Sequence, residues 1–582
     1  MARQLERFGN LVSMFLARAE EKGEKPFLWA KREGTWRSIS WNEAARQVAA
    51  LAESLKRIGL VPGDRVALVS ENRPEWLIAD LGIMAAGCVT VPTYTTNTTR
   101  DHAHILGNSE ARAVIVSSQK LAKNLVPAVL TSSECHHIIG IEDIRAGQTP
   151  DWVNVHRWDE FVSVKADVEA LREREKVVGR DDLACIIYTS GTGGAPRGVQ
   201  IHHGSILHNV EGCTDIISTD FGWGDEVFLS FLPASHAYEH TGGQMFPIGL
   251  GAEIYYAESL EKLAANIEEV QPTIMVVVPR LFEMLRSRIL KSIEGQGGFA
   301  KYLLHRALKI GADKANGGVK PWDLPMDGIL SLTLRKKIRA RMGQRTKAWV
   351  SGGAPLNPEV GVFFQSLGIT FLQGYGQTEA GPLISCNRPK VGIRLETVGP
   401  PAMNTEVRIA DDGELLVRGE NVMFGYWRNP EETARVLKDG WLATGDVGHF
   451  DAKGRIVITD RKKDLIVNDK GDNVSPQRIE GMLTLHPEIA QAMVYGDRRP
   501  HLVALLVPDP EVARTPDLQA RLQRAVDRVN ADVSVIEKVR RFILADEGFT
   551  IENEQLTPSL KIRRHVISHV YGERLDALYK RS

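Results

Sequence analysis

The stretch YTSGTGGAPRGV, at residues 188–199, has the residue types of a loop that binds phosphate. Its glycines let backbone N–H groups approach an anion closely, and its hydroxyl side chains add donors. Arg197 adds a positive charge. The string does not fit the Walker pattern G-x-x-x-x-G-K-[ST], so an ordinary P-loop NTPase is not expected. We therefore predict a phosphate-binding loop of another kind, with a flexible surface loop as the alternative.

A second polar stretch, LSFLPASHAYEH at residues 229–240, contains Ser235, His236, Glu239 and His240. A serine hydrolase interpretation lacks the G-x-S-x-G elbow, and neighbours in the chain do not form a catalytic triad by adjacency alone. A metal-site interpretation lacks the H-E-x-x-H pattern. Neither chemistry is therefore expected from this stretch by itself.

The elements that must position these residues alternate between short apolar strands and helices. A helix is expected over 42–58, followed by Gly59 as a stop signal, and a second helix over 74–87. One face of the first helix carries Ala44, Val48, Leu51, Leu55 and Ile58. Strands are expected at 65–70, 88–92, 113–117, 184–188, 227–232, 273–278 and 348–351. This alternation predicts an α/β fold with largely parallel sheets.

The character of the chain changes near Thr397, where short strands separated by Gly, Asp and Asn turns predict a β-rich subdomain. The charged cluster DRKKD follows at 460–464, and the remaining residues suffice for a small α+β domain. We expect a large N-terminal domain of α/β subdomains at 1–459, whose β-rich part spans about 397–459. A small mobile α+β C-terminal domain is expected at 460–582.

Composition is that of an ordinary globular protein. The chain has 582 residues, 43% hydrophobic and 25% charged, with a formal net charge of -1. This balance gives no global support for nucleic-acid binding. The five scattered cysteines show no zinc spacing, and their odd number favours a reducing compartment over a disulfide framework. The first residues lack the pattern of a signal peptide, and no run of 18 apolar residues occurs, so a cytoplasmic location is expected.

The loop at 188–199 closely resembles the phosphate loop of the AMP-forming adenylating superfamily, which includes acyl-CoA synthetases, luciferases and adenylation domains. The usual string there is YTSGTTGxPKGV, so this chain departs at Gly194 and Arg197. Further segments resemble the family in the same order: VSGGAPL (350–356), QGYGQTEAGP (373–382), WLATGDVGHFD (441–451), GRIVITDRKKDLIV (454–467) and LTPSLKIRRHVI (556–567). The resemblance spans roughly residues 20–570. The long segment 279–345 resembles the long-chain acyl-CoA synthetase branch.

The resemblance implies an ATP site. Tyr375 would lie against the adenine, Thr378 near the α-phosphate, and Asp446 would accept hydrogen bonds from the ribose hydroxyls, with Arg461 also reaching the ribose. The ATP-binding residues implied are Thr189, Ser190, Gly191, Thr192, Gly193, Arg197, Gly352, Gly353, Ala354, Pro355, Gln373, Gly374, Tyr375, Gly376, Gln377, Thr378, Asp446 and Arg461.

The same resemblance implies catalytic roles for Lys561, Glu379, His236 and Thr189. Glu379 would hold Mg2+, which prefers few carboxylates combined with phosphate oxygens. His236 would line the carboxylate pocket, and Lys561 would bridge the substrate carboxylate and the α-phosphate. Asp460 would be the hinge at 460–461 about which the C-terminal domain rotates, and Gly471 would then lie beside the thiol tunnel.

The implied reaction activates a fatty acid, expected to be long-chain, with ATP through an acyl-adenylate, and transfers the acyl group to coenzyme A. The cofactor and substrates are then Mg2+, ATP and coenzyme A. Alternatives are a fatty acyl-AMP ligase that delivers to a carrier protein, a ligase for another hydrophobic carboxylic acid, and a non-catalytic homologue that binds nucleotide or lipid. The acyl pocket is expected from residues 236–280 and 350–380.

Seven cations fall between Arg335 and Lys347 in the string RKKIRARMGQRTK. One interpretation is a basic helix that contacts an anionic membrane. The other, which we favour here because the apolar side is short, is a solvated helix face. Peripheral membrane contact and a homodimer are therefore kept as partner hypotheses, and no nucleic-acid partner is expected.

Overall fold

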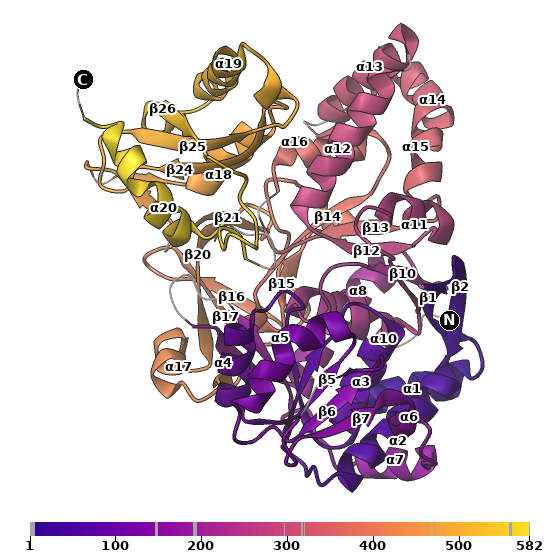
Figure 1. Ribbon diagram of the computed structural model, residues 1–582. Coiled ribbons are helices and arrows are strands. Elements are labelled where there is room, and N and C mark those ends of the chain that lie inside the picture. The colour runs from indigo at the N-terminus through magenta and orange to yellow at the C-terminus, as the bar shows by residue number, and fades with distance from the viewer. Residues whose placement is uncertain are drawn as a thin grey trace.

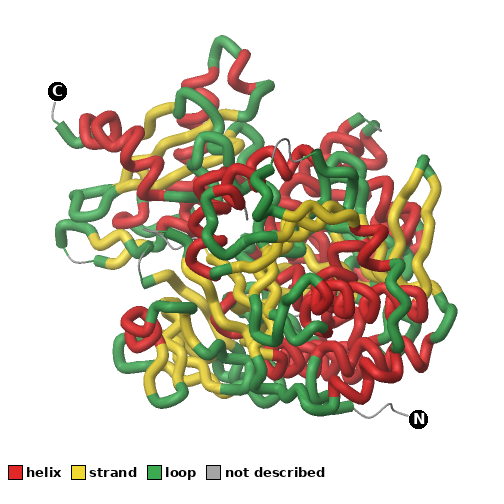
Figure 2. The backbone as a smooth tube through the Cα atoms, turned by 60° about the horizontal axis from the view of Figure 1, so that its bottom comes forward, coloured by secondary structure: helices red, strands yellow, loops and turns green. Residues whose placement is uncertain are grey.

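The structure is a computed structural model. It describes residues 6–145, 149–189, 195–295, 297–315, 318, 320–354, 356–462, 464–470, 472–557 and 562–580. The expected α/β architecture, with a large N-terminal part, a β-rich part and a smaller α+β part, is confirmed (Figure 1). The two ends of the described chain lie on opposite sides of the molecule (Figures 1 and 2).

The first sheet has the strand order β18-β9-β8-β4-β3-β5-β6-β7. Its centre is parallel, whereas β9 runs antiparallel to both of its neighbours, β8 and β18. The strands in this order are Gly425–Tyr426, Arg197–His202, Leu183–Thr189, Val89–Pro92, Arg65–Val69, Ala111–Val116, His137–Gly140 and Asn154–Arg157. The hairpin of β8 and β9 therefore carries the predicted phosphate loop at one end of this sheet.

The second sheet has the order β15-β14-β13-β12-β10-β11-β1-β2 and is parallel except at its two ends. Its strands are Leu383–Cys386, Phe371–Gly376, Ala348–Ser351, Ile274–Val277, Val227–Ser230, Glu253–Tyr256, Pro26–Arg32 and Thr35–Ser40. The carboxyl ends of β13 and β14 lead directly into the stretches 352–354 and 377–379. Ligands of α/β sheets bind outside such strand ends, so this edge is where a site is expected.

Helices cover both sheets. The predicted helices at 42–58 and 74–87 are α2, Trp41–Arg57, and α3, Pro74–Ala85. Ser40 caps α2 by accepting from the Glu43 N–H at 3.2 Å, and α3 is buried along its whole length. The other helices of the N-terminal part are α1 Leu11–Lys22, α4 Thr99–Ser109, α5 Gln119–Leu130, α6 Trp158–Val162, α7 Val168–Glu175, α8 His203–Asp220, α9 Ala237–Glu239, α10 Phe246–Leu250, α11 Leu263–Val270, α12 Pro279–Glu294, α13 Gly298–Ala315, α14 Leu324–Leu332, α15 Leu334–Met342 and α16 Pro358–Ser366.

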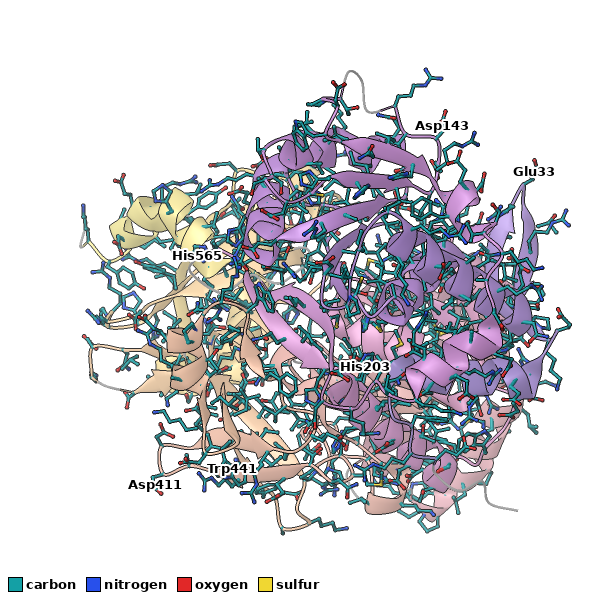
Figure 3. All side chains as sticks on the ribbon, turned by 90° about the horizontal axis from the view of Figure 1, so that it is seen from below. Glu33, Asp143, His203, Asp411, Trp441 and His565 are labelled. Carbon is teal, nitrogen blue, oxygen red and sulfur yellow. The ribbon has the colours of Figure 1, made fainter. Side chains whose placement is uncertain are left out.

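The β-rich part forms a third sheet, in which β17 and β21 flank the long strand β20. Its strands are β16 Glu406–Ile409, β17 Glu414–Arg418, β19 Leu437–Lys438, β20 Trp441–Phe450 and β21 Ile456–Arg461, and α17 spans Pro430–Val436. Seen from below, Trp441 of this sheet and His565 of the C-terminal part lie on the side opposite Glu33 (Figure 3). The expected hinge residues Asp460 and Arg461 are thus the last two residues of a strand.

The C-terminal part has its own core around a three-stranded sheet of order β24-β25-β26 within the described residues. Its elements are β22 Ile466–Val467, β23 Asn473–Val474, α18 Pro476–Thr484, β24 Ile489–Tyr495, β25 Leu502–Pro508, α19 Leu518–Ala531, β26 Val539–Leu544 and α20 Arg564–Ala577. The expected strands QAMVYG and HLVALLV fall in β24 and β25. This part lies to one side of the hinge, above the third sheet (Figure 1).

A carboxyl group is buried in the N-terminal core beside the predicted site. Glu239 is 1% exposed, and its Oε1 accepts from Ser230 Oγ at 2.6 Å and from Gln244 Nε2 at 3.3 Å. Tyr256 Oη donates to Gln244 Oε1 at 2.9 Å. Burial raises the pKa of Glu239 to about 8, so this side chain is protonated at neutral pH. The polar network is therefore a neutral one inside an apolar core.

Replacing Glu239 with Gln should remove a pH dependence of stability. Because the pKa is raised on folding, the folded state binds the extra proton between about pH 4.5 and 8, and stability falls as pH rises through that window. The loss should approach about 1.4 kcal/mol per pH unit. We expect the difference in Tm between wild type and Glu239→Gln to shift steadily in favour of the variant from pH 5 to 8. Exposed Glu268→Gln is the control, and a constant difference would contradict the assignment.

Candidate active site

A cavity of about 2090 Å³ lies between the second sheet, the third sheet and the C-terminal part. Every site residue that was predicted from the sequence and that the structure describes lines this cavity. These residues are Thr189, Arg197, His236, Gly352, Gly353, Ala354, Gln373, Gly374, Tyr375, Gly376, Gln377, Thr378, Glu379, Asp446, Asp460 and Arg461. The predicted residues Ser190, Gly191, Thr192, Gly193, Pro355, Gly471 and Lys561 lie outside the described residues.

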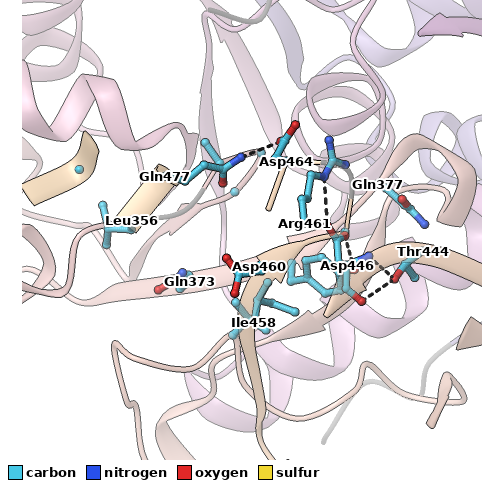
Figure 4. Close-up of a pocket in the computed structure, with 18 of the residues that line it drawn as sticks. Leu356, Gln373, Gln377, Thr444, Asp446, Ile458, Asp460, Arg461, Asp464 and Gln477 are labelled. Atoms are coloured by element: carbon cyan, nitrogen blue, oxygen red, sulfur yellow. Dashed lines mark hydrogen bonds and ion pairs between the residues drawn. The ribbon is translucent and has the colours of Figure 1, made fainter. Parts of the chain in front are cut away.

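Asp446 is the polar centre of one side of the cavity. Tyr375 Oη donates to its Oδ2 at 2.6 Å. Arg461 Nε donates to its Oδ1 at 3.0 Å (Figure 4). Thr444 Oγ1 accepts from the Asp446 backbone N–H at 3.1 Å. Asp446 is 5% exposed and faces Arg461 across the β20–β21 pair. Residues of the second sheet, the third sheet and the hinge are thus joined through one carboxylate.

The phenol of Tyr375 is held as a neutral donor. Burial, and after it the charge of Asp446, raise the pKa of Tyr375 well above its usual value. The ring was predicted to lie against an adenine, and its hydroxyl here reaches the residue predicted to bind the ribose. Both predictions are compatible with one tyrosine, because its ring face and its hydroxyl address different groups.

Glycine is required at 376 by close packing. A Cβ at this position would lie 1.9 Å from the carbonyl oxygen of Pro382, so no larger residue fits without moving the backbone. The chain then turns through a short 3-10 helix, Thr378–Ala380, which places Glu379 beside the cavity. The pattern GYGQTEAG therefore encodes a tight strand end followed by a turn that presents a carboxylate.

Glu379 has a partner that the sequence analysis missed. Tyr426 Oη donates to Glu379 Oε1 at 2.9 Å, and Tyr426 lies on β18, which pairs with β9. Burial, and after it the charge of Glu379, raise the pKa of Tyr426 well above its usual value, so it too stays a neutral donor. Its contact with Glu379 could not be predicted from the sequence, because it depends on the pairing of Tyr426 with Val199, more than 200 residues away in the chain.

Arg197 was predicted to grip phosphate, and in this structure it makes two contacts within the protein. Its guanidinium forms an ion pair with Glu432 and lies over the ring of Tyr426, 4.5 Å from the ring centroid. Glu432 belongs to α17, where its backbone N–H is capped by Asn429. Glu432 also lines the cavity and was not predicted. The positive charge that replaces the usual lysine is therefore partly balanced by a carboxylate of the chain.

The histidines near 236–240 separate into two environments. His236 lines the cavity, and its Nδ1 accepts from the backbone N–H of Tyr238 at 3.2 Å. His240 is fully buried and pairs with Asp80 at 2.9 Å. No group of three His, Cys, Asp or Glu residues that could hold a metal ion occurs in the described part of the chain. His240 is accordingly a core residue.

An apolar arm of the cavity extends between α8 and the second sheet. It is lined by side chains from α8, α10 and the strands β12 and β14: Cys213, Ile216, Ile217, Phe246, Ile274, Val276 and Leu372. The segments 236–280 and 350–380 were expected to line it, whereas the contribution of α8 was missed. A signal was present, because Asn209, Cys213, Ile216 and Ile217 follow the spacing of one helical face.

The C-terminal part closes the other side of the cavity. Thr557 and Ile562, which flank the interval containing Lys561, both line it, as do Ser475 and Arg564. Arg564 forms a partly buried ion pair with Glu480, with N–O distances of 2.5 and 2.6 Å. Asp460 Oδ1 is buried with no hydrogen-bond partner among the described residues, and burial raises the pKa of this carboxyl. The predicted hinge residue Asp460 thus has an acceptor oxygen beside the cavity that no described residue satisfies.

The chain matches two family models in succession. Residues 15–427 match the model described as AMP-binding enzyme, and residues 463–582 match AMP-binding enzyme C-terminal domain. The long-chain-fatty-acid--CoA ligase FadD15 of Mycobacterium tuberculosis is 33% identical over 575 residues, covering 94% of this chain and 93% of that protein. The chloroplastic long-chain-fatty-acid--[acyl-carrier-protein] ligase AEE15 of Arabidopsis thaliana is 28% identical, covering 96% and 85%.

A solved structure gives the same fold. The A domain of carboxylic acid reductase from Segniliparus rugosus, in complex with AMP and a co-purified carboxylic acid, superposes with a TM-score of 0.75. The match covers 99% of this chain and 94% of that chain at 22% identity. Similarity at this identity shows a shared architecture.

Replacing Glu432 with Gln should strengthen ATP binding. The amide keeps the shape and the hydrogen-bond acceptor but removes the charge that competes with phosphate for Arg197. The KM for ATP in ATP–pyrophosphate exchange should fall about three- to tenfold, since a partly exposed ion pair contributes on the order of 1 kcal/mol. Arg197→Lys should raise this KM modestly. A compact ammonium cannot bond Glu432 and the phosphates of ATP together as the planar guanidinium can.

The control is Glu431→Gln, which removes a neighbouring exposed carboxylate of the same helix and should leave the KM unchanged. A rise in KM for Glu432→Gln would mean that this carboxylate positions Arg197 for ATP, which contradicts competition. Loss of all activity in Arg197→Lys would show that the loop grips phosphate differently.

Proposed function

We infer that this chain, which belongs to the family of AMP-binding enzymes, activates a long-chain fatty acid with ATP and transfers the acyl group to coenzyme A. It is then an AMP-forming acid–thiol ligase. The observation that carries this proposal is a single cavity that contains two carboxylates, Asp446 and Glu379, and an apolar arm. A nucleotide and a hydrophobic acid could occupy it together.

In the first half-reaction, a carboxylate oxygen of the acid attacks the α-phosphorus of ATP. The bond to the bridging oxygen breaks, and pyrophosphate leaves with its electron pair. Asp446 and Arg461 would hold the ribose, and His236 would face the carboxylate of the acid. Thr189 and Arg197 would contact the phosphates, and Lys561 would neutralise charge between the carboxylate and the α-phosphate. Positioning and electrostatic stabilisation would supply most of the catalysis.

Mg2+ fits the donor set at Glu379. This residue offers one carboxylate to the cavity, and its neighbour Tyr426 donates to one of the two oxygens. Magnesium is commonly held by one or two carboxylates together with phosphate oxygens and water, so one protein ligand suffices when ATP brings the rest. When bound, the ion would neutralise the charge of the phosphates. Glu379 is the residue that we propose holds it.

In the second half-reaction, the thiol sulfur of coenzyme A attacks the acyl carbon, AMP leaves, and the thiol proton is released. We propose that rotation about Asp460 and Arg461 exchanges the segment of Lys561 for that of Gly471 at the cavity. Hinges are commonly a few element-terminal residues, and these two end β21. The carboxyl of Asp460 is partly buried, and one of its oxygens has no partner among the described residues, which supports a residue whose environment changes in the cycle.

The acyl chain length rests on the apolar arm and on the relative. FadD15 is named a long-chain-fatty-acid--CoA ligase, and the arm is lined by apolar side chains from several elements. The runner-up acceptor is a carrier protein, because AEE15 is named an acyl-carrier-protein ligase. The homodimer and the cytoplasmic location stay predictions, and peripheral contact with lipid is a further proposal.

The experiment that tests the function measures AMP release with a series of acids from acetate to long-chain acids, with coenzyme A or with holo acyl carrier protein as acceptor. We expect release that depends on both ATP and coenzyme A and is highest with long-chain acids. Preference for the carrier protein would establish the alternative acceptor. Absence of ATP–pyrophosphate exchange with every acid would contradict an adenylating enzyme.

Replacing Lys561 with Ala should slow pyrophosphate release by about 100-fold or more, since a cation aimed at developing negative charge typically contributes that much. Thioester formation from preformed acyl-adenylate and coenzyme A should proceed at nearly the wild-type rate, because the proposed role belongs to the first half-reaction. Lys580→Ala, in the same basic tail, is the control. Equal rates of pyrophosphate release in wild type and Lys561→Ala would refute the role.

A further inference from the structure

Large apolar side chains are exposed in unusual density on the helices that follow β12. Of the nineteen exposed large hydrophobic residues among the described residues, seven fall between 284 and 332. They are Met284 at 40% exposure, Phe299 at 75%, Tyr302 at 50%, Trp322 at 73%, Leu324 at 58%, Ile329 at 50% and Leu332 at 77%. Scattered single apolar residues are normal on a protein surface, but a cluster marks a contact surface.

The outward face of α14 is entirely apolar. Its exposed residues are Leu324, Pro325, Gly328, Ile329 and Leu332, whose spacing places them within about 140° of the helix circumference. Trp322 precedes them in the adjoining 3-10 turn, Pro321–Asp323. A surface helix normally turns its apolar side toward the core and its polar side toward water, so α14 has the reverse arrangement.

Ion pairs and packing hold α14 in this orientation. Asp327, on the inward side, accepts from Lys314 Nζ at 2.8 Å and from Arg335 Nη1 at 2.7 Å. Leu330 is fully buried against Ala307 and Ile310 of α13. The apolar face therefore cannot turn inward without breaking a partly buried charge network. Its exposure is built into the fold.

The charge around this face has one sign. Residues 297–345 contain eleven Lys and Arg residues against three Asp and no Glu, whereas the whole chain has a net charge of -1. The three Asp side chains are at most half-exposed, so every exposed charge among the described residues of this segment is a cation. Lys320 Nζ lies 5.9 Å from the ring centroid of Trp322. On α15, which follows α14 after Thr333 alone, the exposed cations are Lys336, Lys337, Arg339 and Arg341.

We propose that α14, Trp322 and the exposed cations of α15 form a docking surface for an anionic lipid bilayer. The apolar face would enter the boundary between headgroups and acyl chains, and the cations would contact lipid phosphates. The helices lie along one outer edge of the molecule, on the side away from the C-terminal part (Figure 1). No helix in the described residues is long and apolar enough to cross a membrane, so the contact is one at the surface.

Charge complementarity favours lipid over a second copy of this chain. A two-fold contact would place the same patch on both partners, so cations of α15 would face cations. An anionic bilayer instead offers acyl chains to the apolar face of α14 and negatively charged headgroups to the cations of α15. The proposal departs from our expectation of a solvated helix face at 335–347, because the apolar face of α14 lies beside these cations.

The helices that carry this surface do not line the cavity themselves, but α14 packs on α13, which packs on α16 at the border of the cavity. Residue pairs of α13 and α16 pack together, and Asn357, Pro358 and Glu359, at the start of α16, line the cavity, as does Arg286 of α12. A contact with lipid here would bring the cavity close to a store of hydrophobic acid. The docking proposal does not depend on the enzymatic activity, since it concerns binding to lipid alone.

The test is co-sedimentation of the full chain with vesicles of equal parts phosphatidylcholine and phosphatidylglycerol, compared with phosphatidylcholine alone. We expect stronger partitioning to the anionic vesicles, weakened by added salt. Trp322→Ser with Leu332→Ser should lower the partition coefficient by about 100-fold, from the loss of two buried apolar side chains. Lys336→Gln with Lys337→Gln should lower it by about fivefold per cation.

Matched controls are Val177→Ser with Val535→Ser, two highly exposed valines elsewhere, and Lys120→Gln with Lys123→Gln on α5. They should bind like wild type, and circular dichroism should show all variants folded. Brominated lipid should quench the tryptophan fluorescence of the wild type, and the quenched fraction should be smaller in Trp322→Phe because that variant lacks the tryptophan at the patch. Equal sedimentation of wild type and both patch variants would overturn the proposal. Light scattering that shows a dimer lost in Trp322→Ser/Leu332→Ser, with lipid binding unchanged, would assign the patch to a protein contact instead.

Discussion

The carboxylate of Asp446 is the point on which the geometry of the site depends. It is buried, its two oxygens are bound by Tyr375 and Arg461, and the pairing of β20 with β21 places it opposite Arg461. A buried carboxylate without partners would be costly, so the arginine of the hinge is held against the third sheet as long as this charge is there. The position of the C-terminal part at the cavity is therefore coupled to the group that would bind the ribose.

A second charged cluster lines the same cavity. Tyr426 donates to Glu379, and its ring lies under the guanidinium of Arg197. Arg197 in turn forms an ion pair with Glu432. In the absence of a polyanion, these partly buried charges balance one another within the protein. We propose that ATP replaces part of that balance, because Arg197, which stands where the usual family string has lysine, pairs with the carboxylate of Glu432 on α17. The apolar arm beside α8 then accounts for the other half of the proposed substrate pair.

Much of this could be predicted from the sequence, because local patterns carry it. The spacing of Ala44, Val48, Leu51 and Leu55 predicts both ends of α2 to within one residue. The string QGYGQTEAGP predicts Gly376 as a site residue, and the structure adds the reason for the glycine, which is the close carbonyl of Pro382. The partners Tyr426 and Glu432 could not be predicted, since they reach the site through the pairing of β18 with β9. The outward apolar face of α14 was also missed, because periodicity reveals that a helix has two faces but does not tell which one is exposed.

We propose that the cavity is one site in which Asp446 anchors both the nucleotide and the hinge residue Arg461. A crystal structure of the protein with ATP and a non-hydrolysable fatty-acid analogue tests this most directly. We expect ribose hydroxyls within hydrogen-bond distance of the Asp446 carboxylate, phosphates between Thr189 and Glu379, and the acyl chain along Ile216, Ile217 and Phe246. A nucleotide bound away from Asp446, or an acyl chain outside this arm, would contradict it.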